Sequence, residues 1–237
     1  MRGSHSALTR SMQTQRGFSL IELMVAITLG LIVLAGVTGI FSATVGTNSA
    51  VIKVTQLNQD LRAAMEFMSH DIRRNGYFSG DPTTANNPFQ AEFLVAPSPG
   101  PCMLYAYDTK LDQALGNEDK LGFRLSGGAV QVRRSGAACD ATGWENITDP
   151  NTVTVTSLQF TRTAIFCTNI TTPVHTDCLP TKGGAANPEY VAPVTGNITL
   201  TTYDVSIDLT GALKSDAATS VTLSQVVRIK NDSIRTI

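Results

Sequence analysis

The distribution of hydrophobic and polar positions divides the chain into an apolar N-terminal run, an amphipathic stretch and a polar C-terminal part. Residues 18–41 carry one charge, Glu22, among side chains that are otherwise mainly apolar. These 24 residues would form a helix about 36 Å long, which is enough to cross the hydrocarbon core of a bilayer. The run therefore predicts a transmembrane helix. Glu22 needs an explanation, because an unpaired carboxylate in hydrocarbon costs several kcal/mol.

The helix is predicted to continue from Phe18 towards Asn75, because no proline occurs before Pro82. Beyond the apolar run, hydrophobic side chains recur every three or four residues, at Val54, Leu57, Leu61, Ala64 or Met65, Met68 and Ile72. The other faces carry charged and polar side chains. This spacing predicts that residues 42–76 form an amphipathic helix packed on its own globular domain, with Gly76 as the C-cap.

The remaining residues, 77–237, show the alternation of β-strands. Residues 77–101 are rich in Pro, Asn, Gly and Ser and predict a long connecting loop. Residues 120–125 and 129–134 flank a Ser-Gly-Gly turn and predict a hairpin. Longer alternating stretches rich in Thr and Val occupy residues 152–166, 197–210 and 220–231. The expected fold class is therefore α+β, with an antiparallel sheet laid on the amphipathic half of the long helix.

All four cysteines lie in the polar C-terminal part, at Cys102, Cys139, Cys167 and Cys178. An even number of cysteines beyond an export-type segment favours disulfides in an oxidising compartment. No Cys-x-x-Cys pair occurs, and three pairings are possible. We favour pairing of sequence neighbours, Cys102 with Cys139 and Cys167 with Cys178. Four buried thiols are the alternative.

The charge of the chain gives no electrostatic reason to expect a nucleic-acid partner. The sequence has 18 Lys and Arg against 19 Asp and Glu, a net charge of −1. Loss of Arg2, Arg10 and Arg16 with an N-terminal leader would leave 15 against 19, a net charge of −4. A local patch at Arg133 and Arg134 is the one candidate contact for DNA.

The order of features at the N-terminus differs from that of a secretory signal peptide. Such a peptide is cleaved after its apolar region, whereas here the small residue Gly17 precedes that region and follows Arg16. The basic flank predicts a cytoplasmic N-terminus and a C-terminal part across the membrane. The sequence from Gly17 to Glu22, GFSLIE, resembles the type IV prepilin motif, or class III signal. A plain membrane anchor would explain the apolar run, but neither Glu22 nor the Gly17 junction.

The resemblance implies that prepilin peptidase removes residues 1–17 and N-methylates Phe18. Residues 1–11 then either follow an upstream start codon or are a cloning remnant. Glu22 becomes the fifth mature residue. It is expected to pair with the new amine of a neighbouring subunit during assembly, and a protonated, neutral Glu22 is the alternative. The implied architecture is the pilin fold.

Two further segments resemble PilW-type minor pilins. The first ends the long helix with Asp71-Ile72-Arg73 and Gly76-Tyr77, and the second is the terminal VVRIKND. The resemblance implies a minor pilin that initiates assembly with other minor pilins and the major pilin on an inner-membrane platform, beneath a tip adhesin. Adhesion and twitching motility would follow, and the protein would move from the inner membrane to the pilus. J-type pseudopilins of type II secretion share much of this pattern and are the alternative. A pilin that binds DNA or a receptor is the third hypothesis.

No residue constellation argues for catalysis, so we expect a structural protein with no catalytic residue, metal or cofactor. His70 beside Asp71 and His175 near Asp177 have no nucleophile motif with them. The histidines and cysteines lack the spacing of a metal site. We interpret residues 117–119 as a solvated acidic turn rather than a calcium loop.

Overall fold

The computed structural model describes residues 17–81, 87–97, 99–171 and 175–237. The expectations for a leader and its origin concern residues 1–16 and lie outside this part of the chain. The chain divides into two compact units between Val51 and Ile52, and the helix α1, Leu20–Ile72, contributes to both. The predicted end of the transmembrane segment, at residue 41, stays a prediction.

The second half of α1 buries the stripe that its sequence predicts. Among the stripe positions Val54 is the exception, with an exposed fraction of 37%. The buried members are Leu57, Leu61, Ala64, Met65, Met68 and Ile72. These side chains recur at one turn of helix, so packing against the β-rich domain explains why the helix persists beyond its apolar run.

The helix ends three residues earlier than its sequence predicts. Ile72 is its last residue, and three tight turns follow. In them the Arg74 amide donates to the Asp71 carbonyl and the Asn75 amide to the Ile72 carbonyl, both at 3.0 Å, and the Tyr77 amide donates to the Arg74 carbonyl at 2.9 Å. Gly76 has a φ of +74° and its amide donates to Ala106 at 2.8 Å. The prediction of Gly76 as the C-cap of α1 is therefore wrong, because the glycine lies in the last of these turns and starts the path away from the helix.

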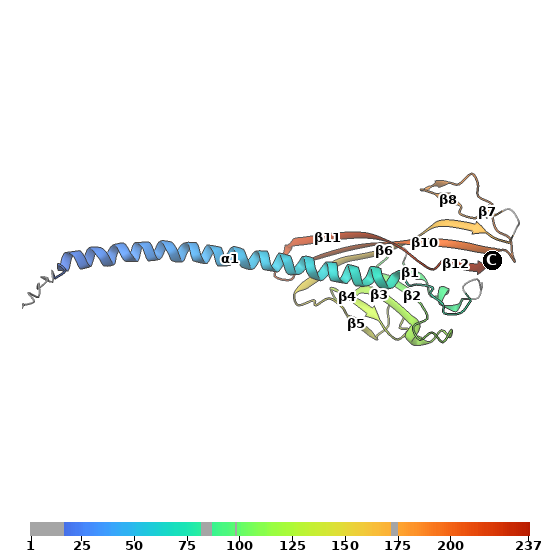
Figure 1. Ribbon diagram of the computed structural model, residues 1–237, viewed down its shortest axis with the longest axis horizontal. Coiled ribbons are helices and arrows are strands. Elements are labelled where there is room, and N and C mark those ends of the chain that lie inside the picture. Colours follow the sequence, from blue (N-terminus) through green and yellow to red (C-terminus); the bar gives the residue numbers. More distant parts are fainter. Residues whose placement is uncertain (1–16, 82–86, 98, 172–174) are drawn as a thin grey trace, which may run out of the picture. The chain divides into compact units, whose positions relative to one another are not determined.

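The first sheet is an antiparallel meander in the order β1-β2-β3-β4-β5 (Figure 1). Its strands are β1 Leu94–Ala96, β2 Cys102–Ala106, β3 Lys120–Ser126, β4 Ala129–Arg133 and β5 Trp144–Asn146. The predicted hairpin is confirmed as β3 and β4, joined through Gly127 and Gly128 with φ of +60° and +75°. The prediction of a loop over residues 77–101 is wrong in part, because the 3₁₀ helix η1, Pro88–Gln90, and β1 lie within it.

The second sheet has the order β11-β10-β6-β7, and β12 also pairs with β10. Its strands are β6 Val153–Asn169, β7 Thr176–Asp177, β10 Ile198–Leu213, β11 Asp216–Arg228 and β12 Ser233–Thr236. A small ribbon joins β8 Thr181–Lys182 to β9 Ala185–Ala186. The sequence predicts one sheet, but the described residues form two five-stranded sheets besides this ribbon, because the meander pairs each strand with its sequence neighbour before the chain reaches β6.

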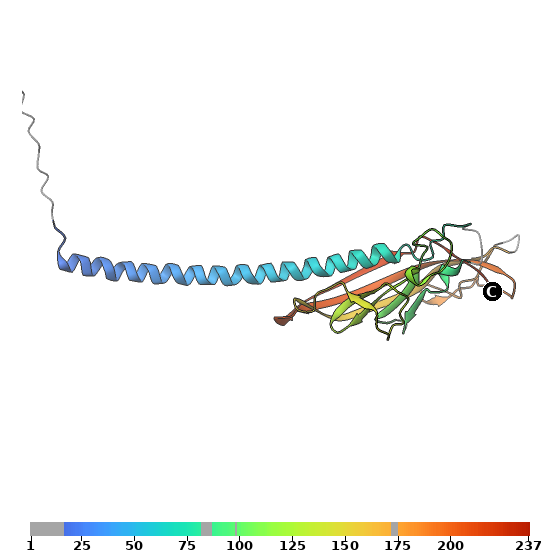
Figure 2. The ribbon, with the colours of Figure 1, turned by 90° about the horizontal axis from the view of Figure 1, so that it is seen from below.

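One hydrophobic core joins the second half of α1 to both sheets, which lie alongside it (Figures 1 and 2). Leu61 and Met68 of α1 are fully buried in the same cluster as Phe123 of β3 and Leu158 of β6. Gly211 of β10 permits a close approach of α1, since a Cβ added there would lie 2.8 Å from the Leu61 side chain. The core therefore requires both the helical stripe and a residue without a side chain on the facing strand.

Candidate processing and assembly site

The bond between Gly17 and Phe18 lies just before the first turn of α1. The Leu23 amide donates to the Ser19 carbonyl at 3.1 Å, so helical hydrogen bonding starts at Ser19. The Phe18 side chain has an exposed fraction of 84%, and no described atom lies within 4 Å of a Cβ built on Gly17. In the described part of the chain, nothing covers this bond against a peptidase.

Glu22 lies in the first turn of α1, where a carboxylate interacts favourably with the positive end of the helix dipole. Its side chain is exposed, and it has no hydrogen bond or ion pair with any described residue. The dipole alone offsets only about 1 kcal/mol of the cost of placing such a charge in an apolar setting. The carboxylate is therefore open to a partner from another chain.

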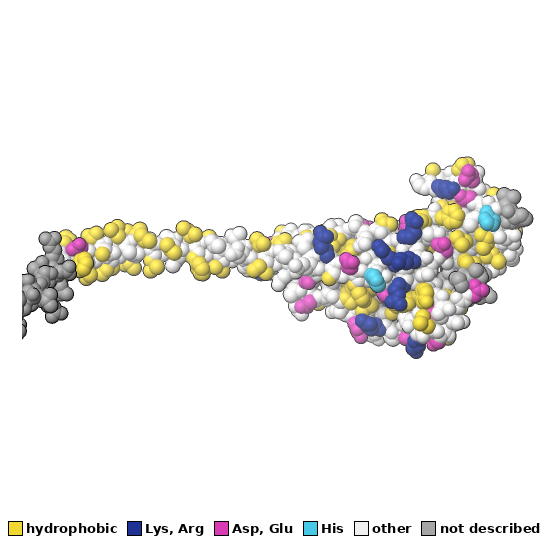
Figure 3. Space-filling model, in the orientation of Figure 1, with side chains coloured by type: hydrophobic (Ala, Val, Ile, Leu, Met, Phe, Trp, Pro, Cys, Tyr) yellow, Lys and Arg dark blue, Asp and Glu magenta, His cyan; other side chains and the backbone are white. Residues whose placement is uncertain are grey.

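The rest of the N-terminal segment presents an apolar surface (Figure 3). The hydroxyls of Thr28, Thr38 and Thr44 each donate to a carbonyl four residues earlier, at 3.1, 2.9 and 2.9 Å. These bonds satisfy the polar groups inside the helix itself. Among the described residues α1 is the one helix that is long and apolar enough, by length and composition, to cross a membrane.

Comparison with known proteins identifies two regions of similarity. The prokaryotic N-terminal methylation motif matches residues 12–38, which include Gly17, Phe18 and Glu22. The family described as prepilin peptidase-dependent protein B matches residues 50–229, about three quarters of the chain. The chain belongs to the prepilin peptidase-dependent protein B family. A curated member of that name from Escherichia coli strain K12 is 22% identical over 153 residues, covering 62% of this chain and 78% of the relative. No solved structure matches the chain.

The predicted resemblance to type IV pilin-like proteins is confirmed, because the methylation motif and the family match both support it. The α+β pilin fold is also confirmed, as a long N-terminal apolar helix followed by an antiparallel β-sheet domain. This member of the prepilin peptidase-dependent protein B family is thus a minor pilin or pseudopilin with a membrane-anchoring N-terminal helix. The individual roles of Gly17, Phe18 and Glu22 stay predictions.

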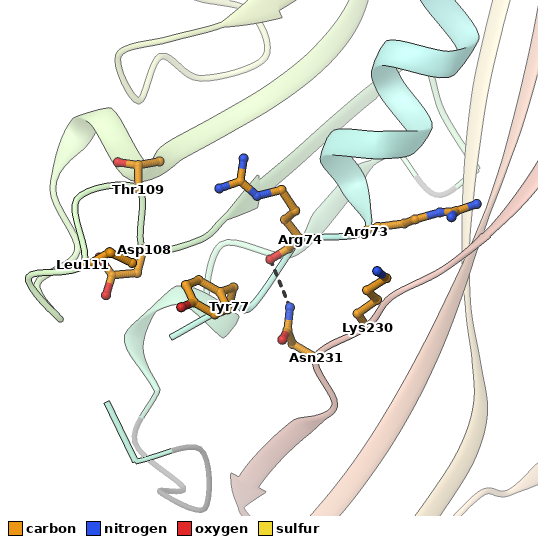
Figure 4. Close-up of a pocket in the computed structure, with 8 residues that line it drawn as sticks. All are labelled: Arg73, Arg74, Tyr77, Asp108, Thr109, Leu111, Lys230 and Asn231. Atoms are coloured by element: carbon orange, nitrogen blue, oxygen red, sulfur yellow. Dashed lines mark hydrogen bonds between the residues drawn. The ribbon is translucent and has the colours of Figure 1, made fainter. Parts of the chain in front are cut away.

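In this family member the two segments that resemble PilW-type minor pilins lie in contact. The Lys230 amide donates to the Arg73 carbonyl at 3.1 Å, and the Asn231 side chain donates to the Arg74 carbonyl at 3.2 Å (Figure 4). They border a cavity of about 400 Å³ that Tyr77 also lines. The segment after β11 therefore fixes the chain at the end of α1 by backbone and side-chain hydrogen bonds to its carbonyls.

Asp71 fixes the end of α1 from the other side. Its carboxylate accepts hydrogen bonds from the Tyr105 hydroxyl at 2.5 Å and the Tyr107 hydroxyl at 2.8 Å. Burial, together with the negative charge of Asp71, raises the pKa of both tyrosines above the ordinary value of 10.0. The Arg74 guanidinium lies 4.0 Å above the Tyr107 ring. These contacts join the helix end to β2, and sequence reasoning missed them because the partners lie more than thirty residues apart.

Replacing Asp71 by alanine is expected to lower the free energy of unfolding by about 2–3 kcal/mol, because the buried Tyr105 hydroxyl loses its charged acceptor. Denaturant unfolding of the full chain in detergent micelles measures the change. Asp71→Asn, which keeps one acceptor oxygen, should cost about half as much. In the Tyr105→Phe background the effect of Asp71→Ala should shrink, and full additivity of the two changes would contradict the assignment.

Two predictions about charged residues are wrong in whole or in part. Arg133 is 1% exposed, and its guanidinium donates to the carbonyls of Leu121 and Ala137, so it cannot form a DNA-binding patch with Arg134. The interpretation of residues 117–119 as a solvated turn is wrong in part, because Asn117 and Glu118 are exposed but Asp119 is fully buried. Burial opposes its ionisation, but hydrogen bonds from Thr109 and the Gly116 amide outweigh this and lower the pKa of Asp119.

The remaining candidate residues are the two histidines and the four cysteines, and they do not come together in one site of the described chain. His70 and His175 are exposed, as their interpretation as surface residues requires. Disulfides join Cys102 to Cys139 and Cys167 to Cys178, the pairing of sequence neighbours. Within residues 17–81, 87–97, 99–171 and 175–237, no group of three or more His, Cys, Asp and Glu side chains is arranged to hold a metal ion.

Proposed function

We propose that this protein is a minor type IV pilin, a structural subunit without catalytic activity. The observation that carries the proposal is the exposed Gly17–Phe18 junction followed by Glu22, the one charged residue of the apolar run 18–41, inside the methylation motif. The Escherichia coli relative is named for its dependence on prepilin peptidase. We extend that dependence to this chain, with cleavage between Gly17 and Phe18 and N-methylation of Phe18.

Cleavage would create a positive amine at Phe18, four residues before Glu22. A carboxylate buried among apolar helices without a partner costs several kcal/mol. An amine at the same axial position on a neighbouring helix offsets that cost by pairing with the carboxylate. Pairing of Glu22 with the Phe18 amine of a neighbouring subunit would therefore favour one axial offset between subunits over all others. The exposed apolar surface of α1 supplies the contact area for such packing.

The finer role rests on the resemblance to PilW-type minor pilins. The subunit would insert in the inner membrane with a cytoplasmic N-terminus and a periplasmic domain, as the basic flank of the apolar run favours. It would then help initiate assembly with other minor pilins and the major pilin on the inner-membrane platform, beneath a tip adhesin. The fibre would support adhesion and twitching motility.

A deletion strain tests this role. Loss of the gene is expected to reduce the number of surface fibres and twitching, and the wild-type gene should restore both. Mass spectrometry of sheared fibres should find the protein starting at an N-methylated Phe18. Normal fibres together with a loss of exoprotein secretion would instead identify a pseudopilin of a type II secretion system. Normal fibres and normal secretion would contradict both roles.

A further inference from the structure

The strand β11 forms one edge of the second sheet. It pairs with β10 in an uninterrupted register, from Asp204 opposite Arg228 to Ala212 opposite Ser220. No other strand of the described chain pairs with its second edge. Figure 1 shows β11 on the outside of β10 and β6. This unpaired edge is longer than the edge strands β1, β5, β7 and β12, which have four residues or fewer.

The hydrogen-bond phase shows which backbone groups of β11 are free. The Ile229 amide donates to the Tyr203 carbonyl at 3.0 Å, so this pair is a hydrogen-bonded one. Such pairs alternate along an antiparallel ladder. The odd-numbered residues of β11 therefore bond β10, and the backbone groups that face outward belong to Ser220, Thr222, Ser224, Val226 and Arg228.

This edge lacks the features that keep exposed strands from pairing with other chains. Natural edges are usually protected by charges, proline or a bulge. Between Asp216 and Arg228 there is no charged residue and no proline, and the register shift of the hairpin lies beyond Ala212 and outside the edge from Ser220 to Arg228. Val226 has an exposed fraction of 64%. The edge is therefore a template for one more strand.

The surroundings of β11 indicate the chemistry of that strand. A groove of about 230 Å³ lies between α1 and β11, and its lining is Arg62, Met65, Glu66, Leu223, Ser224 and Gln225. The apolar members, Met65 and Leu223, can contact apolar side chains that alternate along an added strand. At the C-terminal end of β11, Arg228 is exposed, but its guanidinium pairs with Asp204 of β10 at 2.7 Å. The Lys230 and Arg73 side chains have no hydrogen bond or ion pair within the described residues. A carboxylate at that end of the added strand would be attracted to these two cations.

We propose that the outer edge of β11 binds an extended segment of a different subunit by β-strand addition. The segment places alternate apolar side chains toward α1 and an acidic side chain beside Lys230 and Arg73. The inference rests on the proposed function, because the partner is a fellow subunit of the same assembly. Main-chain hydrogen bonds to Thr222, Ser224 and Val226 supply affinity, and the groove and the cations supply specificity.

A second copy of this chain is the competing occupant. Two β11 strands paired about a two-fold axis at Thr222 would set Asp216 opposite Arg228, which is favourable. However, residues 52–72 of α1 run parallel to β11, with Leu57 near Leu213, Met65 near Leu223 and Arg73 bonded to Lys230. A two-fold pair would point these helical segments in opposite directions, which does not suit chains inserted in one membrane.

Photo-cross-linking of the full-length protein in cells that assemble fibres tests the proposal. p-Benzoylphenylalanine replaces Thr222 or Val226 on the edge, or Thr161 on β6, which lies on the same sheet face two strands away. We expect both edge positions to cross-link one segment of one partner, at residues about four apart as strand pairing requires. Thr161 should give no such product. Absence of a polypeptide cross-link, sites without this register, or a product with β11 of another copy would each overturn the proposal.

A proline variant tests the backbone hydrogen bonds. Val226→Pro removes an outward amide without removing a bond to β10, and the control Val226→Thr keeps that amide and the side-chain shape. With p-benzoylphenylalanine at Thr222, the proline variant should lower the cross-link yield about tenfold, the effect of one lost hydrogen bond. Equal yields from the two variants would overturn the strand-addition mode. The register measurement stands without the proline variant, should that variant fail to fold. Processing at Phe18 and dependence on Glu22 are measured separately, so the proposed function can hold where strand addition fails.

Discussion

Replacing Glu22 by alanine is expected to abolish incorporation of this protein into fibres while its β-rich domain stays folded. The reason is electrostatic: the variant leaves the Phe18 amine of a neighbouring subunit unpaired among apolar helices. Breaking a buried ion pair in this way costs about 3–5 kcal/mol, a factor of a hundred or more in the assembly equilibrium. The amount of the protein in sheared fibres, relative to that in membranes, measures the effect.

Two controls separate assembly from processing and folding. The variant must still yield Phe18 as its N-terminus, and both disulfides must form, so that a loss from fibres is not a loss of maturation or of the fold. Glu22→Gln keeps the size and polarity of the side chain but not its charge. If a protonated, neutral Glu22 were sufficient, Glu22→Gln would assemble like the wild type, whereas the ion-pair hypothesis expects it to fail. Normal incorporation of Glu22→Ala would count against the proposed role of this residue.

Periodicity along one element could be predicted well from the sequence. The apolar run and the stripe from Leu57 to Ile72 depend on a spacing of three or four residues, which local sequence shows directly, and the structure buries that stripe. The β3–β4 hairpin was also predicted, because Gly127 and Gly128 mark a turn that needs positive φ. In each case the partners lie within one element or across one turn.

The missed features depend on residues that are distant in sequence. Strand β1 is three residues long, too short to show alternation, and it forms because β2 pairs with it. Arg133 was misjudged because its charge indicated a surface position, whereas carbonyls of Leu121 and Ala137 satisfy its guanidinium inside the domain. Asp71 was noticed in a motif, but its tyrosine partners on and just after β2 could not be inferred without the fold. Tertiary hydrogen bonds thus determine the positions of Arg133 and Asp71, which composition and spacing do not show.

Removing the bond between Cys102 and Cys139 is expected to lower the free energy of unfolding by about 4 kcal/mol, the largest loss of stability that we predict. The two cysteines are 37 residues apart, so the bond removes more conformational freedom from the unfolded chain than the bond across 11 residues between Cys167 and Cys178. Cys102 begins β2, which is buried at every position, and Cys139 lies in the connection between β4 and β5. The bond therefore joins an inner strand of the first sheet to the loop between β4 and β5.

The paired alanine variants, each lacking one disulfide, form a matched comparison. The variant without Cys167 and Cys178 should lose about 3 kcal/mol by the same chain-entropy argument. Alanine is used because it adds no hydroxyl at Cys102, which is 4% exposed. Denaturant unfolding of the full chains in detergent micelles measures both losses. The Arg124 guanidinium donates to the backbone carbonyls of residues 139 and 141, and these bonds do not depend on the disulfide. In the variant without Cys102 and Cys139, proteolysis of this loop should therefore begin only after those bonds open. A larger loss from the shorter loop would contradict the entropic account and would locate the stabilising effect in the folded state instead.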